Sequence, residues 1–173
     1  MDYKLELIKL IDKFIVESVE EFKEAEVLIL NDCGFKKMFR KHDYQGNINK
    51  LKAVKKHAQK LNPSSVKVPE SDVETRKLQK QFEKCMIVFN SVCDAYVQMQ
   101  LALKEKAEGS GLQYKEYRLI HDRVKAAKAA LNDHMHDMDI LYSDFADITR
   151  GHDEEEEIAQ FGNVKVMTYE DLK

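Results

Sequence analysis

Two long runs of apolar residues at helical spacing constrain this chain more than any other feature of its sequence. Between residues 72 and 150 the glycines are confined to the segment Glu-Gly-Ser-Gly at 108–111, and proline is absent. On either side of that segment an apolar residue recurs at every third or fourth position, which is the spacing of a seam between packed helices. The runs therefore predict helices over 72–108 and 113–150, each on the order of 55 Å long. Because the loop between them is short, they should be antiparallel neighbours.

The two seams differ in how much of each helix is apolar. The first comprises Leu78, Phe82, Cys85, Phe89, Val92, Tyr96, Met99 and Leu103. The second comprises Tyr117, Ile120, Val124, Ala127, Leu131, His134, Met138, Leu141, Phe145 and Ile148. The helix over 72–108 also carries apolar residues on its flanks and outer face, so it should lie at the centre of the fold, surrounded by neighbours. Its start is predicted at the capping-box motif Ser71-Asp-Val-Glu74.

Two further segments have helical patterns. Residues 2–31 predict one long helix, whose seam comprises Ile8, Ile11, Ile15, Ser18, Phe22, Ala25 and Ile29. Residues 35–42 and 48–61 are amphipathic and are separated by Asp-Tyr-Gln-Gly-Asn, which predicts a turn, with one kinked helix as the alternative. The chain is therefore expected to be all-α, an elongated antiparallel four-helix up-down bundle with three long helices. A three-helix bundle capped by a short basic helical hairpin is the alternative.

The domain organisation follows from these helices. A chain of 173 residues can bury one full core, so residues 1–150 are expected to form a single helical-bundle domain. Residues 151–173 form an acidic tail that either docks on the bundle or stays flexible. No apolar run approaches the roughly 20 residues needed to cross a bilayer. Three cysteines, Cys33, Cys85 and Cys93, without a Cys-x-x-Cys motif favour free thiols in a cytoplasmic protein.

Residues 131–140, Leu-Asn-Asp-His-Met-His-Asp-Met-Asp-Ile, place two histidines and three aspartates close together in sequence. Residues two apart on a helix point about 200° apart, so His134 and His136 cannot bind one metal ion while helical. His136 falls on the outer face with Asp133 and Asp137, where a solvated polar strip is expected. The Glu-x-x-His pattern of di-iron bundles is absent, and no carboxylate falls in the seams of the other helices. The sequence therefore predicts no metal site.

His134 falls in the seam of its own helix, level with position 86 of the preceding helix and within a turn of Cys85. The favoured interpretation is a buried polar group, His134, Cys85 and Ser18, in which the histidine fixes the register of the helices and Ser18 is a candidate partner. The alternative is a catalytic Cys–His pair. No third orienting group accompanies it, and the chain contains no glycine-rich phosphate loop and no Gly-x-Ser-x-Gly or His-Glu-x-x-His motif. We therefore expect no catalytic residue, no cofactor and no small-molecule substrate.

Basic residues are concentrated between residues 35 and 61, although the net charge of the whole chain is only −3. This segment could bind an anionic partner, nucleic-acid phosphate or an acidic lipid surface. The residues expected to make those contacts are Lys36, Lys37, Arg40, Lys41, Lys52, Lys55, Lys56 and Lys60. The alternative is neutralisation by acidic residues of the same chain, in the helix over 2–31 or in Asp-Glu-Glu-Glu-Glu at 153–157.

The absence of catalytic motifs and the long apolar seams favour a non-catalytic cytosolic protein that acts as an interaction or scaffold protein. Its partners are expected to be proteins, including further copies of itself as a homo-oligomer. A binding module for an anionic surface, through residues 36–60, is the alternative function.

Overall fold

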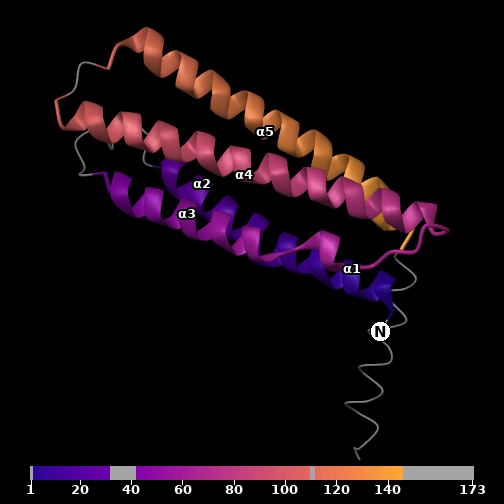
Figure 1. The fold of residues 1–173 in the computed structure, drawn as a ribbon. Coiled ribbons are helices and arrows are strands. Elements are labelled where there is room, and N and C mark those ends of the chain that lie inside the picture. Colours follow the sequence, from indigo (N-terminus) through magenta and orange to yellow (C-terminus); the bar gives the residue numbers. More distant parts are fainter. Residues whose placement is uncertain (1, 32–41, 110–111, 146–173) are drawn as a thin grey trace, which may run out of the picture.

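The computed structural model describes residues 2–31, 42–109 and 112–145, and within these it shows an antiparallel helical bundle with no strand (Figure 1). The helix α1 (Tyr3–Lys13) continues through a π-helical segment (Phe14–Val19) into α2 (Glu20–Asn31) as one long helix. The remaining elements are α3 (Tyr44–Lys60), a short 3-10 turn (Pro63–Ser65), α4 (Val73–Ala107) and α5 (Tyr114–Ser143). The predicted all-α bundle with three long helices is confirmed.

The helix α4 is the central element. It packs against α5 on one side and α3 on the other, as Figure 1 shows, and α3 and α5 both run antiparallel to it. The ring of Phe14 lies against Phe82 and the ring of Phe22 against Tyr96, so the α1–α2 helix runs parallel to α4. The fully buried residues of α4 include Leu78, Phe82, Cys85, Phe89, Val92 and Cys93. The central position that its all-round apolar surface predicted is therefore confirmed.

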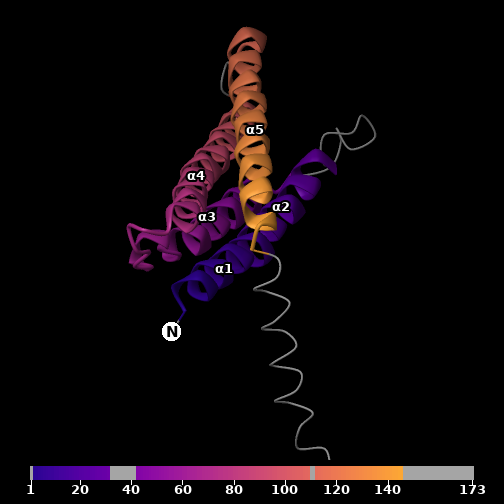
Figure 2. The same cartoon turned by 90° about the vertical axis from the view of Figure 1, so that its right-hand side faces the viewer.

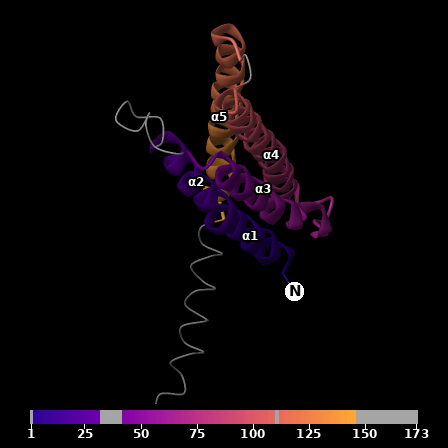
Figure 3. The ribbon, with the colours of Figure 1, turned by 90° about the vertical axis from the view of Figure 1, so that its left-hand side faces the viewer.

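The helices α5 and α2 diverge toward the N-terminal end of α5 (Figures 2 and 3). Where α5 lies beside the α1–α2 helix, the Tyr142 hydroxyl donates to Asp12 of α1 at 2.7 Å, and the Lys128 Nζ lies 2.6 Å from the Glu26 Oε1 of α2. Since α2 ends at Asn31, the first turns of α5 have no α2 residue at their level. Among the described residues, this end of α5 packs on α4 alone.

The π-helical segment displaces the seam predicted for residues 2–31. Phe14 is fully buried, whereas Ile15, the predicted seam residue, is only half-buried. A π-helical turn contains more residues than an α-helical turn, so the apolar stripe of α1 shifts as it passes into α2. Ser18, Phe22, Ala25 and Ile29 keep their predicted buried positions.

The start of α3 differs from the prediction of a turn at residues 43–47. The Asp43 side chain caps the helix by accepting the Gly46 backbone N–H at 2.8 Å, so α3 begins at Tyr44. Gly46 fits there because a Cβ at this position would collide with the Asp43 carboxylate. The glycine taken as a helix breaker is therefore part of the first helical turn. The predicted helix at 35–42 lies outside the described residues, except for His42.

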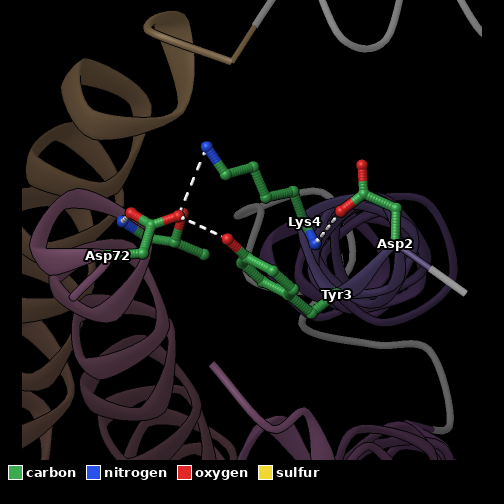
Figure 4. A network of polar contacts seen from close by, with 5 residues as sticks. Asp2, Tyr3, Lys4 and Asp72 are labelled. Carbon is green, nitrogen blue, oxygen red and sulfur yellow. Dashed lines mark hydrogen bonds and ion pairs between the residues drawn. The ribbon is translucent and has the colours of Figure 1, made fainter. Parts of the chain in front are cut away.

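The start of α4 is fixed by Asp72, and the prediction that Ser71 caps this helix is wrong. The Asp72 carboxylate accepts the Thr75 backbone N–H at 3.1 Å and the Tyr3 hydroxyl at 2.9 Å, and it lies 3.2 Å from the Lys4 Nζ (Figure 4). The hydrogen bond from Thr75 is the largest of several contacts that lower the pKa of Asp72 to about 2. This cap therefore also ties the beginning of α1 to the beginning of α4.

The helix α5 begins at a capping box in which the Gln113 side chain accepts the Glu116 N–H and the Glu116 carboxylate accepts the Gln113 N–H. Its buried side chains are spaced seven residues apart, at Val124, Leu131 and Met138, and the buried Phe145 after the helix extends the series. The helix ends at Ser143, with Asp144 as its C-cap, so the prediction that it continues to 150 is wrong for residues 144 and 145, which form a turn. Residues 146–150 and the predicted tail at 151–173 lie outside the described residues. Within the described ranges, every helix is too short or too polar to cross a membrane.

Candidate functional site

His134 belongs to a small polar layer between α4 and α5. The Gln81 Nε2 lies 3.2 Å from the His134 Nδ1 and also donates to the His134 carbonyl oxygen at 3.0 Å. The Cys85 thiol donates to the same carbonyl oxygen, also at 3.0 Å. The structure thus brings Cys85 and His134 together at the level that the helix register predicted. Gln81, which the sequence reasoning missed, is buried one turn before Cys85 on α4.

Ser18 is buried but does not join this layer. Its Oγ is enclosed and has no hydrogen-bond partner among the described residues. The expectation that Ser18 bonds to His134 is therefore wrong, because Gln81 occupies that role from α4 instead. Of the predicted polar group, only His134 and Cys85 are in contact.

The geometry of Cys85 does not suit a thiolate nucleophile. Burial, together with the negative charge of Asp137, raises the pKa of the Cys85 thiol to about 12, so it carries its proton at neutral pH. That proton is directed to the backbone carbonyl of His134 and not to its imidazole. A nucleophilic cysteine needs a base within reach of its proton. The contact between these two residues is therefore suited to holding α5 in register with α4.

The other polar residues of the 131–140 segment are separated from His134. Asp133, His136 and Asp137 are all exposed on the outer face of α5, as helical geometry predicted. In the described part of the chain, no three His, Cys, Asp or Glu side chains come together as a metal-binding group.

A second polar layer links three helices, and it contains a buried carboxylate that the sequence analysis did not predict. Glu26 on α2 is buried, with 8% of its surface exposed. It accepts the Tyr96 hydroxyl from α4, and its Oε1 lies 2.6 Å from the Lys128 Nζ of α5. Burial, and next the hydrogen bond to Glu26, raises the pKa of Tyr96 above its ordinary range, so the phenol stays a donor. No sequence motif marked this group, because Glu26 lies beside the predicted seam and not in it.

The lysines of α3 divide between paired and unpaired side chains. Lys55 is paired with Asp94 of α4 at 2.7 Å, so this lysine is neutralised within the chain. The remaining predicted contacts on α3 are Lys52, Lys56 and Lys60, which are exposed at successive turns of the helix. None of the three forms an ion pair within the ranges that the structure covers. Lys36, Lys37, Arg40 and Lys41 lie outside those ranges.

A groove runs between the C-terminal half of α4 and the N-terminal turns of α5, with a volume of about 610 Å³. The α4 wall comprises Ala95, Gln98, Leu101, Ala102 and Glu105. The other wall comprises Leu112, which precedes α5, and the α5 residues Glu116, Leu119, Ile120 and Arg123. Leu119 is 57% exposed and lines this groove together with other apolar side chains. The groove therefore combines an apolar floor with charged side chains at its edges.

The comparisons with known proteins add no functional information to these surfaces. No protein-family model matches the chain, and neither a curated protein nor a solved structure matches it. The α4–α5 groove and the α3 lysines are thus the features from which a function can be proposed.

Proposed function

We propose that this chain is a non-catalytic cytosolic helical-bundle protein that acts through protein–protein contacts, including contacts between its own copies. The observation that carries the proposal is the groove between α4 and α5, where Leu119 and Ile120 adjoin Leu101 and Ala102. Apolar side chains gathered beside a groove cost free energy in water, and burial against a partner recovers it. A cytosolic location is consistent with Cys85 and Cys93, which are both free thiols.

The chemistry of the groove suits a protein partner. Its floor is apolar, and Glu105, Glu116 and Arg123 stand at its edges as exposed charged side chains. An apolar centre surrounded by a polar rim is the usual arrangement of a protein–protein interface. An amphipathic helix that lies in such a groove uses apolar residues at helical spacing as anchors.

The mass of the protein in solution tests this proposal. Sedimentation equilibrium over a wide range of concentrations should give a mass above the 20.2 kDa of one chain. Leu119→Lys should return the mass to that of a monomer, because it places a charge at the centre of the groove. Ile140→Lys is the matched control, since Ile140 is 55% exposed on the same helix but does not line the groove. A strict monomer at the highest concentrations would end the self-association part of the proposal.

A second candidate function is binding to an anionic surface, nucleic acid or acidic lipid, through α3. The observation that favours it is the row of Lys52, Lys56 and Lys60, which are exposed and lack an ion-pair partner among the described residues. Reversing all three to Glu should abolish binding to anionic vesicles and to nucleic acid at low salt. Replacing Lys115 and Lys125 of α5 by Glu should leave binding to vesicles and to nucleic acid intact. Binding that is absent at low salt, or equal in both variants, would exclude α3 as the contact surface.

A further inference from the structure

The groove contains a self-complementary stripe on α5. Glu116, Leu119, Ile120 and Arg123 follow one another at intervals of three, one and three residues, so they share one side of the helix and line the same groove. The stripe has a negative residue at one end, a positive residue at the other and two apolar residues between them. A helix turned end for end presents the same stripe with its charges exchanged. Two copies laid antiparallel would therefore match in both charge and hydrophobicity.

We infer that a second copy of this chain occupies the groove, with the two α5 helices antiparallel about a twofold axis between Leu119 and Ile120. Glu116 of each copy then faces Arg123 of the other, and Leu119 faces Ile120. Such an interface is isologous, so every favourable contact occurs twice, and the assembly closes as a dimer. This inference rests on the proposed function, because it names the partner and the geometry of the same groove.

The α4 wall supports the same arrangement. The contact between Cys85 and His134 fixes the register of α4 and α5, and this register brings Glu105 about level with Glu116. The incoming Arg123 would thus meet carboxylates from both walls of the groove. Arg123 has no ion-pair partner within the described part of its own chain. A guanidinium placed between two carboxylates is a strong and geometrically selective contact.

The small side chains of α4 provide room for the second helix. Ala95 and Ala102 are one heptad apart and both line the groove, so they leave space where a larger residue would hold an incoming helix away. Leu119, more than half exposed in one copy, would become enclosed by Leu101 and by the partner copy. Burial of apolar area at the centre and ion pairing at the rim then act together.

Charge reversal tests the pairing directly in the full chain. Arg123→Glu alone should weaken dimerisation about tenfold or more in sedimentation equilibrium, because each Glu116 would face a glutamate. Glu116→Arg alone should do the same through facing arginines. An equimolar mixture of the two variants should form heterodimers of wild-type affinity, since each contact then joins opposite charges. The double variant carrying both changes should also dimerise.

Two controls separate the interface from the stability of α5. Glu116→Gln removes the charge but keeps an acceptor for the capping box, so a weakened dimer in this variant supports charge pairing over loss of the cap. Arg118→Glu makes the same charge change as Arg123→Glu at a side chain that is 72% exposed and outside the groove. It should leave the dimer unchanged, and circular dichroism should show equal helix content.

The possible failures are distinguishable. If the wild type dimerises but the charge reversals have no effect, the antiparallel α5 interface is wrong while self-association stands. The exposed Val27 and Leu28 of α2 would then be the next surface to vary. If the mixture of the two single variants does not regain affinity, the pairing of Glu116 with Arg123 is wrong. If the wild type is monomeric throughout, self-association fails, and this inference fails with it.

Discussion

Replacing Phe89 by alanine is expected to cost about 3–5 kcal/mol of the free energy of unfolding, the range for a large core aromatic. Phe89 is fully buried near the middle of α4. Its ring centroid lies 5.2 Å from that of Phe14 and 5.7 Å from that of Phe22, in edge-to-face arrangements that add to the effect of burial. The alanine would leave a cavity between α4 and the α1–α2 helix. Chemical denaturation, monitored by helical circular dichroism, measures the loss.

The control for this substitution lies on the same helix. Ile87 is 66% exposed, so Ile87→Ala should change the free energy of unfolding by no more than about 0.5 kcal/mol, as surface substitutions usually do. The difference between the two losses in the free energy of unfolding measures how much the buried side of α4 contributes to stability. Equal effects at both positions, or a loss at Phe89 below that at Ile87, would mean that the aromatic cluster does not anchor the bundle.

The fold could be predicted largely because heptad spacing is a property of many residues at once. Phe82, Phe89 and Tyr96 recur at intervals of seven, and a helix is the only regular element that brings them onto one side. The predictions from sequence were wrong at positions where a single local contact determines the backbone structure. Gly46 is helical because Asp43 caps the first turn of α3. Phe14 is buried in the core instead of Ile15 because the helix widens at a π-helical segment. Neither effect changes the hydrophobic pattern enough to be seen in sequence.

The polar contacts of the core were harder to predict than its apolar seams. The adjacency of Cys85 and His134 followed from the register of two helices joined by a short loop. Gln81 and Glu26 were missed because they lie beside the seams, where long polar side chains are usually solvated. Their burial depends on how closely a third helix approaches, which the sequence pattern of a single helix does not contain. The α4–α5 groove was not predicted for the same reason.

Substitutions in the layer formed by Glu26, Tyr96 and Lys128 are expected to cause the second large loss in the free energy of unfolding. Glu26→Leu should lower the free energy of unfolding by about 2–3 kcal/mol, mainly because the buried Tyr96 hydroxyl loses its acceptor. Lys128 should add little to this loss, since 42% of its side chain is exposed and its ammonium group can return to water. Tyr96→Phe alone should also destabilise, because it removes a donor from a carboxylate that is only 8% exposed.

The double variant Glu26→Leu/Tyr96→Phe distinguishes a coupled polar layer from two independent contacts. Replacing both partners by apolar groups of similar shape leaves no unsatisfied atom, so the double variant should be more stable than the sum of the single losses predicts. A coupling of about 1–3 kcal/mol is expected for residues that share one hydrogen-bond network. Chemical denaturation of the wild type, the two single variants and the double variant measures this coupling energy. Strictly additive losses would show that Tyr96 does not depend on Glu26, and that the layer does not act as a unit joining α2 to α4.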